Sequence, residues 1–269
     1  MEKKERYLGK ELPKDIEKIK RDFIAEFSGD LHEQLNLIKN NYAKEQKTLP
    51  PSAKEKELET FSIKFTYDTQ RIEGSILTLK ETANLLEHGI TPAQKPLRDV
   101  KETEAHSALF FEVLKEKGLS LSVVMHWHKR LFQQTKPDIA GQIRRHQVAI
   151  ARSKFVPPLG VEVYPLLREL FIWYRKTNKT MQPVELAALV HLKFVTIHPF
   201  GDGNGRISRL MANFVLHKAG YPLLNIPYVR RGSYYTALER SQVKKEDTIF
   251  VQWFVKRYLH ENKKYLKNR

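Results

Sequence analysis

Most of the side chains that could do chemistry in this sequence lie in one segment, residues 198–209, which reads HPFGDGNGRISR. Three glycines within five positions permit tight turns and a close approach of a ligand to the backbone. The apolar patterns on either side predict a turn between two helices, the second of which starts near Asn204. The first turn of a helix has free N–H groups at the positive end of its dipole, and these bind anions. The segment therefore predicts an anion site.

The charged side chains of the segment indicate which anion it would bind. Arg206 and Arg209 lie three residues apart in the predicted helix, and two guanidinium groups suit a ligand with several phosphates. Asp202 would repel that ligand unless it held a hard cation such as Mg²⁺ between itself and the phosphates. His198 is the nearby side chain able to act as a base near neutral pH. Together these residues predict a phosphate cradle, a metal carboxylate and a base.

Three common phosphate and cation motifs do not account for the segment. No Gly-Lys-Ser/Thr follows, which excludes a Walker A loop, and the glycine spacing excludes a dinucleotide fingerprint. An EF-hand loop ending at Asn204 and Gly205 would need an acidic residue where Phe200 stands. A plain glycine-rich turn capped by His198 would explain any one of these residues, but not all of them within twelve positions.

A bundle of helices would have to position the segment. Apolar residues recur at helical spacing, strand-like alternation is scarce and no internal repeat is visible, so the sequence predicts an all-α fold. Ser52 with Glu55, and Thr78 with Glu81, form capping-box patterns at two predicted helix starts. Gly141–Val163 lacks helical periodicity and predicts a loop or short hairpin. The predicted helices span about residues 13–45, 52–72, 78–88, 99–117, 120–134, 163–177, 183–197, 204–219, 232–243 and 247–267.

The chain is strongly basic, with 47 Lys and Arg against 31 Asp and Glu in 269 residues, a net charge of +16. The excess concentrates in residues 121–180 and 230–269, on both sides of the motif segment. It is typical of a solvated face, of a rim around a polyanionic ligand, or of a nucleic-acid-binding surface. The absence of cysteine excludes disulfides and cysteine nucleophiles. No apolar run approaches the ~18 residues of a membrane span and no signal peptide is visible, so we expect a cytoplasmic protein with no membrane partner.

Residues 198–209 match the Fic motif, H-P-F-x-D/E-G-N-G-R-x-x-R, at every specified position. The resemblance to Fic domain protein adenylyltransferases, including metazoan members, extends over about residues 60–260. It implies a Fic-fold helical bundle with a short β-hairpin flap beside the active site. It also implies an N-terminal helical extension over residues 1–50, an inhibitory-helix region over 51–98 and a catalytic core over 99–269, as one compact unit.

The family resemblance implies an activity: transfer of AMP from ATP to a Ser, Thr or Tyr hydroxyl of a target protein, which could be the chain itself, with release of pyrophosphate. His198 would deprotonate the hydroxyl, and Asp202 would bind Mg²⁺ or Mn²⁺ between the α- and β-phosphates. Phe200 would anchor the loop in the core. The nucleotide-binding residues of the motif and of the base pocket would be Gly203, Asn204, Gly205, Arg206, Arg209, Tyr234, Tyr235 and Gln242.

The interval from 141 to 158, with GQIR at its start and FVPP at its end, resembles the flap of the family. Its backbone would align a target segment by strand-like pairing. The flap residues in question are Arg152, Ser153, Lys154 and Phe155. Two alternatives stay open from the residues alone: Tyr234 and Tyr235 could be ordinary helix packing, and Arg144 could be a surface charge.

A second motif precedes the core, where residues 69–74 read TQRIEG and fit the inhibitory pattern S/T-x-x-x-E-G/N. The resemblance implies that Thr69, Glu73 and Gly74 form this motif and that Glu73 pairs with Arg209. A carboxylate there would compete with phosphate oxygens for the same guanidinium. The same glutamate positions a water that removes AMP in some relatives, so the dominant direction of the reaction stays open. A homodimer that stabilises the inhibitory helix is expected by family analogy.

Two other functions remain. A Fic-fold transferase could use another nucleotide or another phosphate donor, because the features that would select the base are weak. A basic nucleic-acid-binding protein is the candidate from a different class. The placement of the positive charge around the motif favours an ATP·Mg site over nucleic acid.

Overall fold

Helices form all the regular structure of the residues described by the computed structural model, which are 7, 13, 16–151 and 153–266. The prediction of an all-α fold is therefore confirmed. No helix in these ranges is long and apolar enough to cross a membrane. The α-helices are α1 (Ile16–Thr48), α2 (Pro51–Ile72), α3 (Leu79–His88), α4 (Leu97–Lys115), α5 (Leu121–Phe132), α6 (Gly160–Thr177), α7 (Pro183–Ile197), α8 (Asn204–Lys218), α9 (Arg231–Lys244) and α10 (Asp247–Glu261), with short 3₁₀ turns at Tyr228–Arg230 and Lys263–Leu266.

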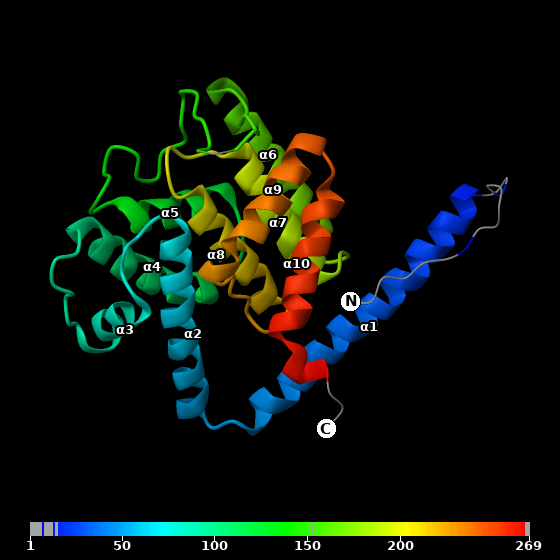
Figure 1. Ribbon diagram of the computed structural model, residues 1–269, viewed down its shortest axis with the longest axis horizontal. Coiled ribbons are helices and arrows are strands. Elements are labelled where there is room, and N and C mark those ends of the chain that lie inside the picture. The colour runs from blue at the N-terminus through cyan, green and yellow to red at the C-terminus, as the bar shows by residue number, and fades with distance from the viewer. Residues whose placement is uncertain (1–6, 8–12, 14–15, 152, 267–269) are drawn as a thin grey trace.

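Helices α7 and α8 form the centre of the bundle and flank the motif segment (Figure 1). Apolar residues lie on all sides of α7, which is the pattern of a fully buried helix. Helix α8 is buried from Asn204 to Leu216 apart from Gly205, which is half-buried. Helices α6 and α10 pack on α7, while α4 and α5 pack on α8. The turn between α7 and α8 is thus held at both ends by the core.

Helix α1 extends away from the body of the molecule (Figure 1). Its C-terminal half joins the core through Leu35 and Ile38, both fully buried. The side-chain amide of Asn41 also donates to the carbonyl of Tyr265 at 2.8 Å, so the C-terminal part of α1 lies beside the end of the chain. The turn between α1 and α2 lies at residues 49 and 50, and part of the proposed extension over residues 1–50 lies outside the described residues.

The capping-box prediction is right for one helix and wrong for another. At α3, the Thr78 hydroxyl accepts a hydrogen bond from the Glu81 N–H at 3.2 Å, and the Glu81 carboxylate accepts one from the Thr78 N–H at 2.8 Å, as predicted. Helix α2 instead begins at Pro51, with Pro50 as its N-cap and no side-chain cap bond. Proline at the first helical position is pre-set for a helix start, so Ser52 lies inside the first turn rather than at the cap.

The predicted β-hairpin flap does not form among the described residues. The backbone is irregular over residues 141–151 and 153–159, and the Ser153 N–H donates to the Ile150 carbonyl at 3.1 Å. Two consecutive prolines at 157 and 158 remove the N–H donors that a second strand would need. Of the four predicted flap residues, Arg152 lies outside the described part of the chain.

Candidate active site

The turn that carries the motif is fixed by two buried side chains. Phe200 is fully buried, as predicted for an anchor. The Asn204 side chain accepts from the Phe200 N–H at 2.9 Å and donates to the Phe200 carbonyl at 2.8 Å. Both polar groups of the Asn204 amide therefore act within the loop. Asn204 shapes the backbone around the expected α-phosphate position rather than reaching out from it.

His198 ends α7 in the left-handed region, at φ 51° and ψ 57°. Its Nδ1 lies 3.2 Å from the carbonyl oxygen of Val195, which can only accept, so Nδ1 carries the proton and Nε2 is left as the basic nitrogen. Burial lowers the pKa of His198 below its ordinary value, and the charge of Arg144 acts in the same direction. The ring is therefore neutral at pH 7, the form that a general base needs.

A second histidine, His128 on α5, contacts the same turn. It accepts the N–H of Gly141 on Nδ1 at 2.9 Å, and its Nε2 lies 3.0 Å from the carbonyl of Asp202. Its ring stacks on Phe200 with 3.7 Å between centroids. Burial lowers the pKa of His128 to about 4, which keeps it neutral for both contacts. Sequence reasoning missed this residue, because nothing in the pattern of α5 separates it from ordinary core histidines.

Arg144 is not a surface charge; it joins the flap to the turn. Its guanidinium donates from Nε to the His198 carbonyl at 2.7 Å and from Nη1 and Nη2 to the carbonyls of His146 and Pro158, at 2.9 and 2.7 Å. The side chain is only 4% exposed. Because three backbone segments share this guanidinium, Arg144 fixes the position of the start of the flap relative to His198.

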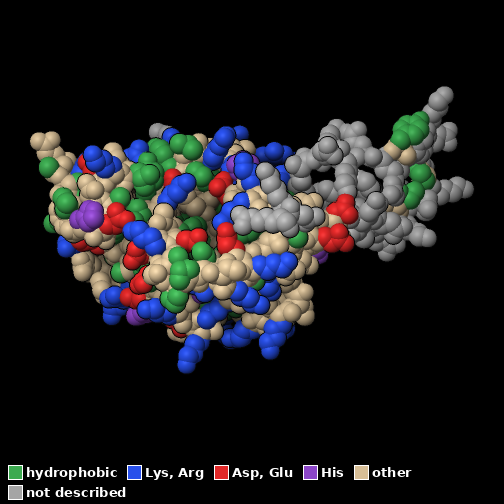
Figure 2. Space-filling view, turned by 90° about the horizontal axis from the view of Figure 1, so that it is seen from below, with side chains coloured by type: hydrophobic (Ala, Val, Ile, Leu, Met, Phe, Trp, Pro, Cys, Tyr) green, Lys and Arg blue, Asp and Glu red, His purple; other side chains and the backbone are tan. Residues whose placement is uncertain are grey.

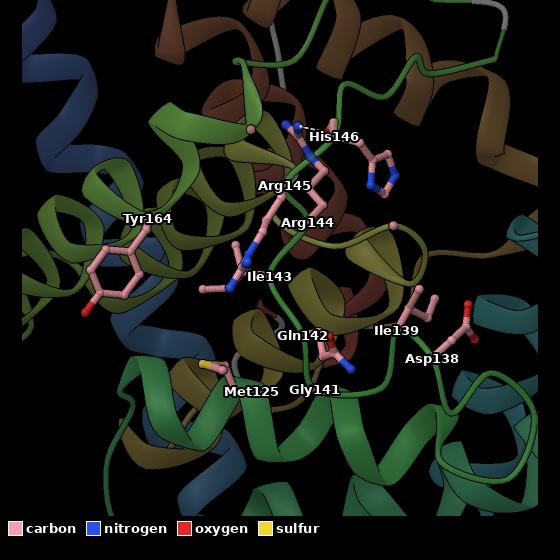
Figure 3. A pocket seen from close by; sticks show the side chains of 12 residues that line it. Met125, Asp138, Ile139, Gly141, Gln142, Ile143, Arg144, Arg145, His146 and Tyr164 are labelled. Atoms are coloured by element: carbon pink, nitrogen blue, oxygen red, sulfur yellow. Dashed lines mark hydrogen bonds between the residues drawn. The ribbon is translucent and has the colours of Figure 1, made fainter.

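A cavity of about 770 Å³ lies beside the start of the flap, with Arg145 and Tyr164 among the residues that line it (Figure 3). The Arg144 side chain turns away from this cavity toward the backbone it binds. Gly160, at the start of α6, also lines it, and a Cβ there would lie 2.2 Å from the carbonyl oxygen of Arg145. The flap backbone and α6 therefore meet too closely at this point for any side chain.

The anion position at the start of α8 is taken by the carboxylate of Glu73. Glu73 directly follows α2, and its Oε1 lies 2.6 Å from Nη2 of Arg209. A Cβ placed on Gly205 would come within 2.4 Å of the same oxygen. Glycine at 205 thus leaves room for an anion against the first turn of α8, and the chain fills that room with its own side chain.

Each nitrogen of the Arg209 guanidinium has a partner. Nε donates to the hydroxyl of Thr69 at 2.8 Å, Nη1 to the hydroxyl of Tyr234 at 3.3 Å and Nη2 to Glu73 at 2.6 Å. Burial raises the pKa of Tyr234 to about 12, so its hydroxyl stays protonated. Of these partners Glu73 is the one that carries negative charge, so a phosphate oxygen that approached Nη2 would compete with it.

Asp202 and Arg206 belong to a network that reaches α4 and α2. Arg206 pairs with Asp202 at 3.0 Å, contacts Glu102 closely and donates to the side-chain oxygen of Gln70 at 3.1 Å. Lys136 in turn lies against both Asp202 and Glu102. Sequence reasoning missed Gln70, Glu102 and Lys136. A signal existed for Glu102, whose spacing from His106, Leu109 and Val113 places a carboxylate on the buried stripe of α4.

The donor set fits a cation that also takes ligands from a bound phosphate. Burial opposes ionisation of Asp202, but the charges of Arg206 and Lys136 hold its pKa below the ordinary value, so it is a carboxylate at neutral pH. Within the described ranges no group of three or more acidic or histidine side chains could hold a metal ion alone. Mg²⁺ commonly takes one or two carboxylates and completes its shell with phosphate oxygens and water.

The three residues predicted to line the nucleotide-base pocket lie in different surroundings. Tyr234 is 1% exposed and belongs to the core. Tyr235 is half exposed, and its hydroxyl donates to the Ile72 carbonyl at 2.9 Å, next to Glu73. Gln242 donates to the hydroxyl of Thr196 at 3.2 Å and lines a cavity of about 380 Å³ that Phe155 also lines. Gln242 and the flap thus share one cavity, and Tyr234 acts through Arg209.

Comparison with known proteins finds a family that matches part of the chain and curated relatives that resemble it. Residues 118–216 match the Fic/DOC family. The protein adenylyltransferase fic-1 of Caenorhabditis elegans is 33% identical over 181 residues, covering 65% of this chain and 35% of that protein. The protein adenylyltransferase Fic of Drosophila ananassae is 33% identical over 178 residues, covering 64% and 35%. The chain thus spans about a third of the length of the curated relatives it matches.

Two solved structures share the fold. A Fic domain containing signaling protein from Bacteroides thetaiotaomicron superposes with a TM-score of 0.78 at 26% identity, covering 87% of this chain and 96% of that one. Residues 134–508 of Fic-1 from C. elegans superpose with a TM-score of 0.76 at 24% identity, covering 91% and 73%.

Proposed function

Because residues 118–216 match the Fic/DOC family, we propose that this chain is a Fic protein adenylyltransferase, which transfers AMP from ATP to a Ser, Thr or Tyr hydroxyl of a target protein. One observation carries the proposal: a single short turn joins a neutral histidine with a basic Nε2 to a helix start whose anion position holds a carboxylate. The names of the relatives support the same reaction.

The proposed reaction assigns each residue a task. Nε2 of His198 takes the proton of the target hydroxyl as its oxygen bonds to the α-phosphorus. The bond from the α-phosphorus to the bridging oxygen breaks, and pyrophosphate leaves with the electron pair. The first N–H groups of α8 hold the α-phosphate, while Arg206 and Arg209 hold the outer phosphates. Asp202 would hold Mg²⁺ or Mn²⁺, which would neutralise charge on the phosphates when bound.

Glu73 is proposed as an internal inhibitor of this reaction. It lies where a phosphate would lie, and its partner Arg209 is one of the two arginines that the outer phosphates need. Thr69 supports the pair by holding Nε of Arg209, and Gly74, at φ +100°, lets the chain turn directly after Glu73. ATP would therefore have to displace Glu73 before its γ-phosphate could take the place of that carboxylate at Nη2 of Arg209. A homodimer that holds α2 in this position belongs to the same proposal.

The flap is proposed to guide the target. Ser153, Lys154 and Phe155 lie on an irregular segment whose start is fixed to the His198 carbonyl through Arg144. A target strand could pair with this backbone and so receive the order that the free flap lacks. The chain itself is one such target.

The pH dependence of the rate should report the state of His198. Its pKa lies below the ordinary 6.5, so the base form persists above that pH and is lost as pH falls through the lowered pKa. We expect the self-labelling rate of the Glu73→Gly protein to be flat from about pH 7 to 8 and to fall with a midpoint below 6.5. Single-turnover labelling across pH, with circular dichroism to check folding, measures this. A midpoint above 7 would contradict the assignment of His198.

A Fic-fold transferase with a different donor is the alternative within the same site. Gln242 and Tyr235 are polar residues of the proposed pocket for the nucleotide base, and they do not by themselves select adenine. Competition of unlabelled ATP, GTP, UTP and CTP against labelled ATP decides between these donors.

The distribution of charged side chains on the surface gives little support to the alternative of a nucleic-acid-binding protein. Figure 2 shows Lys and Arg side chains spread over one face with Asp and Glu side chains among them. Nucleic-acid binders usually gather their charge in a patch or stripe. A gel shift with duplex DNA at several salt concentrations tests this alternative, because phosphate-driven binding weakens steeply with salt.

The direct test of the proposed function is chemical. The purified Glu73→Gly protein, incubated with ATP and Mg²⁺, should gain the mass of one adenylyl group on hydroxyl-bearing peptides of itself or of an added target. Mass spectrometry of the digested protein locates the modified residue. Absence of any such peptide with a folded, ATP-binding protein would refute the proposal.

A further inference from the structure

Lys136 lies in the segment that follows α5, and its ammonium group is held between two carboxylates. Nζ contacts Oδ2 of Asp202 closely and lies 3.4 Å from Oε1 of Glu102. It also lies 5.0 Å from the centre of the Phe132 ring, which gives it a cation–π partner. The side chain is 24% exposed. This lysine is outside the Fic motif, yet it touches the one motif residue expected to hold a metal ion.

Lys136 completes the set of partners around Asp202. Oδ1 of Asp202 accepts the N–H of Gly203 at 2.5 Å and pairs with Arg206 at 3.0 Å, while Oδ2 pairs with Lys136. Both carboxylate oxygens are therefore engaged. Arg206 is buried and is also held by Glu102 and Gln70, so it cannot leave easily. Lys136 has a flexible stem and a solvent-facing side, and it is the partner that can move.

We propose that Lys136 is a built-in counter-cation of Asp202, which a divalent cation must displace when the nucleotide binds and which then turns to the phosphates. The proposal deepens the adenylyltransferase function and rests on it. The physical reason is electrostatic: Arg206 is shared between Asp202 and Glu102, so the two carboxylates without Lys136 would repel an approaching phosphate, and the second positive charge of Lys136 removes this repulsion. The lysine therefore lets the site accept nucleotide before the cation arrives, at the cost of a weaker cation site.

The first test uses metal alone and does not depend on ATP chemistry. Mn²⁺ binding to nucleotide-free protein is measured by electron paramagnetic resonance of the free ion. Lys136→Met keeps the length of the side chain but removes its charge, so Mn²⁺ should bind about tenfold more tightly than to the parent. Adding Asp202→Asn to this variant should abolish the gain. Equal Mn²⁺ affinities in the parent and in Lys136→Met would overturn the proposal.

Two further variants separate charge from structure. Lys136→Arg keeps a cation at the position and should retain the parent affinity for Mn²⁺. Lys95→Met is the matched control, because Lys95 also pairs with a carboxylate, that of Glu81 at 3.4 Å, and is 20% exposed. It should leave Mn²⁺ binding unchanged. Tighter binding in Lys95→Met as well would mean that net charge alone explains the effect, which would also overturn the proposal.

The second test measures the coupling between cation and nucleotide. Calorimetry gives the dissociation constant of a non-hydrolysable ATP analogue, AMPPNP, in EDTA and in saturating Mg²⁺, in the Glu73→Gly background. Lys136→Met should weaken binding about tenfold in EDTA and less than about threefold in Mg²⁺. Equal weakening in both conditions would mark a structural role and reject the proposal. Failure of every variant to bind AMPPNP would refute the adenylyltransferase function, while the Mn²⁺ test would still decide the role of Lys136.

Discussion

Glycine in place of Glu73 is expected to raise self-labelling by ATP about 10- to 100-fold. The carboxylate of Glu73 lies 2.6 Å from Nη2 of Arg209 and against Gly205, in the position that a phosphate needs. A charge-assisted hydrogen bond of this kind contributes about 1.5–3 kcal/mol, and every 1.4 kcal/mol is a factor of ten in an equilibrium. Removing the Glu73 carboxylate should therefore strengthen productive binding of the nucleotide by about that factor. Labelling with ATP carrying a radioactive α-phosphate measures it.

Matched variants make this result specific. Glu87→Gly changes an exposed carboxylate at the end of α3 and should leave labelling as in the parent. Glu73→Gln keeps the shape of the side chain but removes its charge, and should give an intermediate rise because the amide oxygen still reaches Arg209. Equal labelling by the parent and by Glu73→Gly would remove the inhibitory role of Glu73.

Alanine in place of His198, in the Glu73→Gly background, should lower labelling by about 10²- to 10⁴-fold, the usual contribution of a general base. His198 presents a basic Nε2 because its Nδ1 faces the Val195 carbonyl. The base is not part of the anion position, so the affinity for AMPPNP should change by less than about threefold. The test therefore measures two quantities for each variant: the single-turnover labelling rate and the dissociation constant for AMPPNP.

His146→Ala is the control for that variant. His146 is an exposed histidine of the flap, and only its backbone carbonyl is used, by Arg144. It should retain the labelling rate of the Glu73→Gly protein. Full activity in the His198→Ala protein would mean that another group takes the proton, and a large loss in both histidine variants would point to a disturbed flap instead.

The sequence predicted the parts of the site that are local in the chain. The helix ends at His198 and restarts at Asn204 where the glycines and the apolar patterns placed the turn. The pairing of Glu73 with Arg209 is long-range, and it could be anticipated because the resemblance to Fic proteins supplied the partner. From residue types alone, a Ser or Thr four positions before a glutamate carries no such information.

The residues that the sequence did not reveal are those that reach the turn from other helices. Glu102 on α4, Lys136 after α5 and His128 on α5 contact Asp202 or Arg206 only because α4 and α5 pack beside α8. Helix packing of this kind cannot be derived from the spacing of residues within one helix. The flap is the opposite case: the sequence predicted a hairpin there, but Pro157 and Pro158 lack the N–H donors that a second strand would need.

The central claim is that this site transfers AMP, and the position of the label in ATP tests it most directly. The Glu73→Gly protein is incubated in parallel with ATP labelled at the α-phosphate and with ATP labelled at the γ-phosphate, and protein-bound label is counted after denaturation. The proposed reaction predicts label on the protein from the α-phosphate and none from the γ-phosphate, with release of pyrophosphate. Label from the γ-phosphate, or none from either, would contradict it.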